Sequence, residues 1–400
     1  MGIPIVSEIR TRTRYTTSFG ALYTAFVLCG FHWAMVAYIN SSVLEQYVSN
    51  TTIGLLYSLS ALLTIGSFLY ISKILSRVGN FRITLLLGSI ELLLLAGLAS
   101  STGLFLVLSL FVLHQCVVPL ILFNLDIYME EMIGGEEATT GTRRGLLLGL
   151  TSVAGALGPL VSGYLVDAAG GSFTLAYSGS AVVMMLFLFV LFRYFAHTGG
   201  TTLSEIAYLR SVCVFWGRKN LRNVFGAHAL LQLFFVWTVI YIPLYLTTQT
   251  AFTWEEIGLV LFVGLLAYVI FEYPIGFIAD RWWGEKEMML IGFVVLSVSV
   301  AGSAFLEGAS LGAWMAIAFA TRVGASLVET TTESYFFKQT GSADAQLISF
   351  FRITRPLSYL IGALLGSAAL VYMSLNTLFL ALGIVLFLGV AFAIQIKDTK

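Results

Sequence analysis

The amino-acid sequence predicts an all-α integral membrane protein, with twelve transmembrane helices in two pseudo-symmetric six-helix bundles. The chain of 400 residues is 58% hydrophobic and only 10% charged, whereas about a quarter of the residues of a soluble domain are charged. Its apolar runs are long, and its basic residues gather in alternate loops. These features exclude a soluble enzyme, a nucleic-acid binder and a disordered scaffold. The net charge of zero also gives no reason to expect a polyanionic partner.

Twelve apolar runs are long enough to cross the hydrocarbon layer of a membrane, which takes about 20 helical residues. They cover residues 18–40, 51–72, 83–101, 104–129, 145–166, 173–195, 224–247, 256–279, 288–306, 311–336, 347–371 and 375–396. Each run is continuously apolar, whereas a strand of a membrane barrel alternates apolar and polar residues over about ten positions. The runs therefore predict helices.

The Lys and Arg residues indicate the orientation of these helices. Eighteen of the 21 lie in the two tails and in the loops after every second span. The intervening loops, around 41–50, 102, 167–172, 248–255, 307–310 and 372–374, contain none. Because basic loops stay in the cytoplasm, we expect a multi-pass protein of the plasma (cytoplasmic) membrane with both termini in the cytoplasm.

The longest polar stretch divides the chain into two halves. We expect an N-terminal six-helix bundle over 1–198, a cytoplasmic linker over 199–222 and a C-terminal six-helix bundle over 223–400. The linker alternates apolar and basic positions, which predicts an amphipathic helix on the inner membrane face. A plain linker is the alternative.

Equivalent loops of the two halves carry related motifs. SKILSRVGNFR (72–82) follows the second span, and GFIADRWWGEKE (276–287) follows the eighth. They resemble the major facilitator superfamily, whose signature at this place is Gly-x-x-x-Asp-Arg-x-Gly-Arg-Lys. The second copy keeps Gly276, Asp280 and Arg281, with Gly284 one position late, while the first copy has Ser72 and Ser76 in place of Gly and Asp. The resemblance covers the whole chain. It implies a transporter that works by alternating access, with the first, fourth, seventh and tenth helices lining a central cavity.

A second resemblance lies in the fifth span. Gly155-x-x-Gly158-Pro159-x-x-Ser162-Gly163 is similar to the helix-five signature of the drug/proton antiporter branches of the family, with Ser162 in place of one glycine. The alternative is structural, because small residues let two helices approach closely and proline bends a helix.

Charged residues within spans are costly in hydrocarbon, so each is a candidate functional residue. Arg322, Glu329 and Glu333 are spaced by seven and four residues and fall on one stripe of the tenth span. The resemblance implies that this stripe faces the substrate. Arg322 indicates an anionic or zwitterionic solute, or an internal partner for Glu329.

Other polar residues complete the predicted substrate and proton cavity. Gln115 and Asp126 share a face of the fourth span, and His228 and Gln232 share a face of the seventh. Asn40 lies in the first span, and Glu272 in the eighth, which borders the pathway in the family. We interpret Glu91 as a packing carboxyl group, and the histidines show no metal-ligand spacing.

Acidic residues precede basic ones across the inner loops of both halves, and salt bridges there would form a cytoplasmic gate. The predicted gate residues are Glu130, Arg143, Arg144, Asp280, Arg281, Glu333, Arg352 and Arg355. The acidic residues have two competing roles, as permanently ionised latches or as proton carriers. We interpret Glu130 and Glu333 as latches, and both roles stay open for Asp126 and Glu329.

The sequence thus predicts a secondary active transporter of a small solute, not an enzyme. It contains no Gly-x-x-x-x-Gly-Lys-Ser/Thr motif for ATP and indicates no cofactor or metal. We expect a co-transported proton, export, membrane lipid as surroundings, no nucleic acid and a monomer. One alternative is a proton-coupled importer of a sugar or organic acid, bound by Gln115, Asn40, Gln232 and Trp237. The other is a non-transporting receptor or scaffold on the same fold.

Overall fold

The computed structural model describes residues 18–133, 137–195, 216–339, 351 and 354–397. The N-terminal half contains α1 (Phe19–Ala37), α2 (Asn40–Glu45), α3 (Asn50–Val78), α4 (Asn80–Ser100), α5 (Leu104–Ile133), α6 (Glu137–Ala168) and α7 (Thr174–Tyr194). The C-terminal half contains α9 (Lys219–Gln249), α10 (Trp254–Ile278), η1 (Ala279–Trp283), α11 (Glu285–Ser303), α12 (Leu311–Gln339), α14 (Thr354–Leu370) and α15 (Leu375–Gln395).

The predicted spans are confirmed, because each of the twelve contains one long helix of the described chain. Eleven spans are long and apolar enough to cross a membrane on their own. The twelfth, α14, has 17 described residues, and part of its predicted span lies outside them. Two boundaries differ from the prediction. A short buried helix, α2, replaces the start of the predicted loop 41–50, and α9 begins at Lys219, inside the predicted linker.

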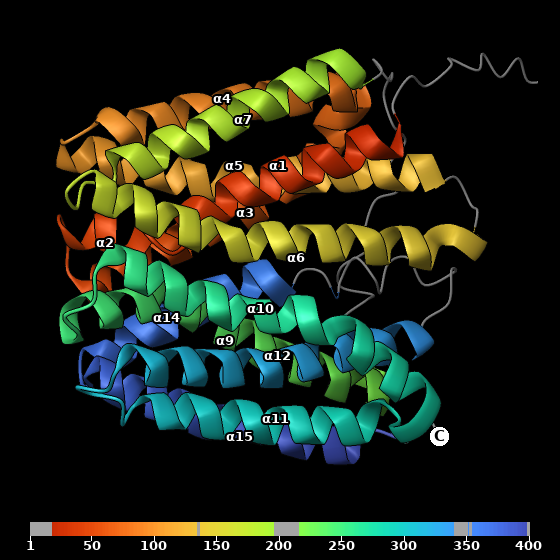
Figure 1. Ribbon diagram of the computed structural model, residues 1–400. Coiled ribbons are helices and arrows are strands. Elements are labelled where there is room, and N and C mark those ends of the chain that lie inside the picture. Colours follow the sequence, from red (N-terminus) through yellow and green to blue (C-terminus); the bar gives the residue numbers. More distant parts are fainter. Residues whose placement is uncertain (1–17, 134–136, 196–215, 340–350, 352–353, 398–400) are drawn as a thin grey trace, which may run out of the picture.

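The two halves lie side by side and exchange helix contacts in a symmetric way (Figure 1). The second spanning helix of the N-terminal half, α3, packs on the fifth spanning helix of the C-terminal half, α14. The fifth spanning helix of the N-terminal half, α6, packs on the second spanning helix of the C-terminal half, α10. The start of α1 and the end of α15 lie on the same side of the molecule. We call this the terminal side and the opposite one the distal side.

One pair of glycines shows the pseudo-symmetry at the level of the backbone. Gly79 and Gly284 end equivalent helices, with φ of 90° and 82°, in a region that favours glycine. Gly284 comes one position late in its motif because the residues before it form the π-helical turn η1, in which the Gly284 N–H donates to the Ala279 carbonyl. A π-helical turn accommodates one residue more than an α-helical turn, so both copies end in the same conformation.

The lateral surface is apolar, as the membrane prediction requires. Phe105, Leu93, Phe192 and Tyr273 are each more than two-thirds exposed. A soluble monomer rarely exposes large apolar patches of this kind. In hydrocarbon such a surface is favourable, because α-helices satisfy their own backbone hydrogen bonds.

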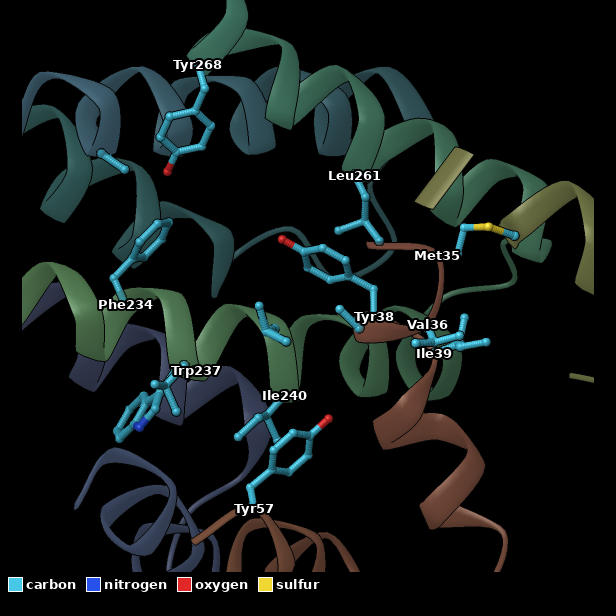
Figure 2. Packing of buried hydrophobic residues seen from close by; sticks show 14 of the residues in the cluster. Met35, Val36, Tyr38, Ile39, Tyr57, Phe234, Trp237, Ile240, Leu261 and Tyr268 are labelled. Atoms are coloured by element: carbon cyan, nitrogen blue, oxygen red, sulfur yellow. The ribbon is translucent and has the colours of Figure 1, made fainter. Parts of the chain in front are cut away.

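Both halves contribute to a buried apolar cluster at the distal end of α1. Tyr38 and Ile39 follow α1 and belong to the same buried cluster as Leu261 of α10 and Ile240 of α9, and Tyr38 lies beside Leu261 (Figure 2). All four side chains are buried. The turn between α1 and α2 therefore inserts apolar side chains of one half into the other.

Candidate functional site

A carboxylate of the N-terminal half binds the start of a helix in the C-terminal half. Asp167, near the end of α6, accepts hydrogen bonds from the backbone N–H groups of Trp254 (3.1 Å) and Glu255 (2.7 Å). These are the first residues of α10. A negative charge at a helix N-terminus is stabilising, because the free N–H groups there carry partial positive charge.

The remaining free N–H groups at this end are satisfied within α10 itself. The Thr253 hydroxyl accepts from the Glu256 N–H at 3.2 Å, and the Glu256 carboxylate accepts from the Thr253 N–H at 2.9 Å. This capping box leaves the N–H groups of Trp254 and Glu255 for Asp167. Separation of the halves would therefore leave two backbone donors in need of new partners.

Glycines allow close approach of backbones next to Asp167. A Cβ atom on Gly258 of α10 would lie 2.5 Å from the Pro159 carbonyl oxygen of α6. Gly163 of α6 packs on Trp254 of α10 in the same contact between the halves, which we call a seam. The Trp254 ring stands edge-on to the Phe173 ring, with 5.1 Å between the ring centres. Two of the small residues in the antiporter-like motif, Gly158 and Gly163, thus pack against neighbouring helices, and Gly158 contacts α1.

The second seam between the halves joins α3 to α14. A Cβ atom on Gly54 would lie 2.8 Å from the Ala363 carbonyl oxygen. Deeper in the seam, the Ser58 hydroxyl donates to the Leu360 carbonyl at 3.2 Å. Gly54 lies near the distal start of its helix, as Gly258 does. Both seams are therefore tight on the distal side.

Three glutamates of the C-terminal half gather nearer the terminal side. Glu272 of α10 accepts a hydrogen bond at 3.5 Å from Ser152 of α6, across the two halves. Glu329 of α12 interacts electrostatically with Glu272, Glu333 and Arg355. All three glutamates are half-buried. The structure thus brings together a predicted cavity residue on α10 and two predicted residues on α12.

His228 and Gln232 of α9 face the same region. Their side chains are buried and lie 3.2 Å apart, and His228 Nδ1 lies 3.5 Å from the Thr332 hydroxyl of α12. Arg355 is exposed and lies over the Trp33 ring of α1 at 5.5 Å. This cation–π contact also crosses the two halves.

Arg322 makes no ion pair with the glutamates among the described residues, although Tyr268 of α10 interacts with Arg322, Glu329 and Glu272. Its buried guanidinium group donates to the Thr321 hydroxyl at 3.0 Å and lies 5.1 Å from the Phe234 ring. It lines a cavity of about 20 Å³ enclosed by α9, α10, α11, α12 and α15, which has room for about one water molecule. Seven residues of helix span about 10 Å, so Glu329 lies at another depth. Among the described residues Arg322 and Glu329 form no ion pair, which was one of the two roles that the sequence indicated for Arg322.

Asn40 and Gln115 belong to the N-terminal half. Asn40 is fully buried at the start of α2, where its Oδ1 atom accepts from the Tyr177 hydroxyl of α7 at 2.6 Å. Gln115 of α5 is half-buried and lies near Tyr57 of α3. Asp126 is half-buried in the terminal half of α5.

The predicted cytoplasmic gate is described only in part. Arg281 is exposed and lies over the Phe277 ring at 4.7 Å, while Glu333 and Arg355 belong to the group above. The side chains of Glu130, Arg143, Arg144, Asp280 and Arg352 lie outside the described part of the chain. The gate therefore stays a prediction.

Sequence reasoning missed two arrangements. Asp167 was not predicted to have a partner, although the Thr253-x-x-Glu256 capping box could have marked the start of α10. Glu91, which we interpret from the sequence as a packing carboxyl group, is indeed buried and hydrogen-bonded, but the two histidines beside it were not predicted. His114 Nδ1 is 2.5 Å and His32 Nε2 is 3.5 Å from the same Glu91 oxygen. No sequence signal joins these three residues, because they lie on three different helices.

The described chain contains twelve long helices in two halves, eleven of them long and apolar enough to cross a membrane, which define a multi-pass membrane protein. Residues 224–399 match the Major Facilitator Superfamily, and residues 13–177 match the MFS_1 like family. These family matches identify it as a transporter and not an enzyme. The chain belongs to the major facilitator superfamily. A comparison with curated protein sequences gives no match.

Solved structures of transporters have the same fold. The nucleoside transporter NupG is 13% identical, with a TM-score of 0.73, over 95% of this chain and 100% of that chain. A POT family transporter in complex with a thioalcohol-conjugated peptide is 13% identical, with a TM-score of 0.75, over 94% and 95%. One in complex with 5-aminolevulinic acid is 12% identical, with a TM-score of 0.74, over the same shares. At these identities the similarity concerns the fold alone.

Proposed function

We propose that the protein is a secondary active transporter that exchanges a small solute and protons across the plasma membrane by alternating access. Its terminal side faces the cytoplasm, as the basic loops indicate, and it works as a monomer in lipid. In this structure the seams of Asp167 and Gly54 hold the distal ends of the two halves together. Opening of the distal side requires both seams to part.

The observation that carries this proposal is the contact between Ser152 and Glu272. It joins the two halves at a cluster of three glutamates. Neighbouring carboxylates of like charge disfavour each other's ionisation, and an opening between the halves would admit water to them. The charge of such a cluster therefore depends on whether the halves are apart, which is what coupling to a proton needs.

Glu329 is the proton carrier that we propose within the cluster, with Asp126 as its counterpart in the N-terminal half. Glu329 lies among Glu272, Glu333 and Arg355, so its carboxyl group can exchange partners as well as protons. Glu333 and Glu130, nearer the helix ends, act as gate latches toward the arginines of the neighbouring inner loops.

Export is the direction that we propose, on the basis of the antiporter-like motif of α6. The solute is amphipathic and carries an anionic or zwitterionic group that Arg322 recognises. Because the cavity beside Arg322 has room for about one water molecule in this conformation, the cavity must widen before the solute's charged group can bind there. We expect Arg322→Ala to weaken the binding of anionic solutes more than that of neutral ones. Equal weakening of both would contradict charge recognition.

The importer of a sugar or organic acid is the second candidate. Three of its four proposed binding groups already have internal hydrogen-bond partners. Trp237 Nε1 donates to the Gly362 carbonyl at 2.7 Å, Asn40 Oδ1 accepts from the Tyr177 hydroxyl, and Gln232 Nε2 lies 3.2 Å from His228 Nε2. Gln232 favours this candidate, because its buried Oε1 atom has no hydrogen-bond partner among the described residues. A receptor or scaffold would need none of these polar groups.

A thermal-shift screen tests the proposal. Purified protein is heated with a panel of organic anions, zwitterions, sugars and amphipathic cations at two pH values. A ligand that binds the folded state raises the unfolding temperature. We expect an anionic or zwitterionic hit whose shift depends on pH after correction for its own titration. A pH-independent hit would contradict proton coupling, and a screen without any hit would favour the receptor or scaffold.

A further inference from the structure

The N-terminal half contains a second group of titratable side chains, away from the glutamates described above. Glu91 of α4, His114 of α5 and His32 of α1 are each fully buried. One carboxylate oxygen of Glu91 contacts both imidazole rings, at 2.5 Å from His114 Nδ1 and 3.5 Å from His32 Nε2. Three helices thus meet at one carboxylate in the membrane interior.

The charge of this group depends on how many protons it holds. With one proton, shared between Glu91 and His114, a carboxylate faces an imidazolium ion and the net charge is zero. With no proton the net charge is −1, and with two it is +1. Net charge in a buried membrane site is costly. The closed bundle therefore favours the form with one proton.

Few other groups act on this site. His114 and His32 are the charged or titratable partners of Glu91 in the described chain, with the Cys29 thiol of α1 beside it. From α7, the Ser180 hydroxyl donates to the His32 carbonyl at 2.9 Å. Among the described residues, α3 and α6 contribute no titratable group that acts on Glu91. The number of protons in the group therefore decides its charge.

The hydrogen bonding of the group is incomplete for a purely structural clamp. Glu91 Oε2, His114 Nε2 and His32 Nδ1 are buried and have no hydrogen-bond partner among the described residues, and His32 Nε2 has only its 3.5 Å contact with Glu91. Buried polar groups that only hold helices together are normally hydrogen-bonded throughout. Open donor and acceptor positions are what a site needs to accept or pass on a proton.

The site is also connected to the boundary between the halves. His32 precedes Trp33, whose ring lies beneath Arg355 of α14 in the other half. Movement of the halves relative to one another changes this contact and with it the surroundings of α1 at His32. The proton site and the moving boundary therefore share one segment of α1.

We propose that Glu91, His114 and His32 form a proton-binding site of the N-terminal half, which holds one proton while the distal seams are closed and releases it when they part. The proton leaves His114 Nδ1 for water, which leaves a carboxylate and two neutral imidazoles, and no other bond changes. This inference rests on the proposed function, since a site of this kind serves a proton-coupled transporter.

Histidine ring NMR tests the proposal without a solute. The chain has four histidines, so ring nitrogens labelled with ¹⁵N can be assigned by single His→Gln variants in lipid nanodiscs. At neutral pH we expect His114 to show the imidazolium signature. Glu91→Gln removes it, while His228 serves as an internal reference. Glu307→Gln, at the distal surface of the other half, is the matched control and leaves His114 unchanged. A neutral His114 in the unaltered protein overturns the proposal.

A titration between about pH 5 and about pH 8, where histidine switches charge, tests proton release in the unaltered protein and in Asp167→Ala. We expect His114 to lose its imidazolium signature at a lower pH when Asp167 is absent, because the open form lets the proton leave. Identical behaviour in both proteins overturns proton release and leaves a static ion pair. A positive result together with a silent solute screen would uphold the site and refute the proposed transport.

Discussion

Replacement of Asp167 by alanine should shift the protein toward a form that is open on the distal side. The change removes two hydrogen bonds from the N–H groups of Trp254 and Glu255 to a carboxylate, at 3.1 and 2.7 Å. Hydrogen bonds to a charged group contribute about 1.5–3 kcal/mol, and a charge at a helix N-terminus about 0.3–2 kcal/mol. Asp167 is only half-buried, so solvent screening lowers these values.

We therefore expect a loss of about 1–3 kcal/mol for the closed form, which corresponds to a change of roughly 5- to 150-fold in the equilibrium between closed and open forms. Asp167→Asn should lie between the wild type and alanine, because the amide keeps one acceptor oxygen but not the charge. The difference between the equilibrium shifts in Asp167→Asn and Asp167→Ala separates the contribution of the charge from that of the hydrogen bonds.

Distances between spin labels measure this equilibrium. Cysteines at Thr102 and Tyr372, which are exposed on the distal side of opposite halves, carry the labels in a chain with Cys213→Ser. Asp167→Ala should increase the population at long distance.

Glu307→Ala is the matched control, because Glu307 bonds Asn376 at 3.3 Å within the C-terminal half and touches neither seam. An unchanged distance distribution in Asp167→Ala, or an equal change in Glu307→Ala, would refute the argument.

Three further substitutions test other parts of the account. Gly258→Val places a Cβ atom 2.5 Å from the Pro159 carbonyl oxygen, and overpacking of this kind costs about 1–3 kcal/mol. The same spin labels should therefore report opening of the distal side. An unchanged, closed distance distribution would show that the contact between α6 and α10 can adjust. Glu329→Gln should abolish solute movement driven by a proton gradient in liposomes but keep solute exchange, and loss of both would identify Glu329 as a latch. Glu285→Ala removes the buried partner of Lys338 and Ser334 and should lower the free energy of unfolding by about 1–3 kcal/mol, whereas an unchanged unfolding temperature would show that this contact adds nothing.

Sequence reasoning predicts the helices well because the membrane constrains them strongly. A span must be apolar and about 20 residues long, and every backbone group must be bonded within it. The motif near Gly284 also predicts the two-fold relation of the halves. Its displacement by one position becomes clear only from the π-helical turn at Ala279–Trp283, since an inserted residue leaves no mark in composition.

The candidate site is less predictable, because its contacts join residues that lie far apart in the chain. Helical periodicity places Arg322 and Glu329 on one stripe, but spacing alone does not show that Arg322 lines a small enclosed cavity while Glu329 lies among other charged groups. Glu91 meets His32 and His114 through packing of three helices. A helix face can be inferred from spacing, whereas the helix that covers it depends on tertiary packing.

The most direct test of alternating access uses two label pairs in the same protein. One pair spans the distal side at Thr102 and Tyr372, and the other spans the terminal side at Val78 and Trp283, which are exposed near Gly79 and Gly284. Asp167→Ala should lengthen the distal distance and shorten the terminal one. If both distances lengthen together, or neither changes, the two halves do not rock about a central site, and the proposed transport mechanism is contradicted.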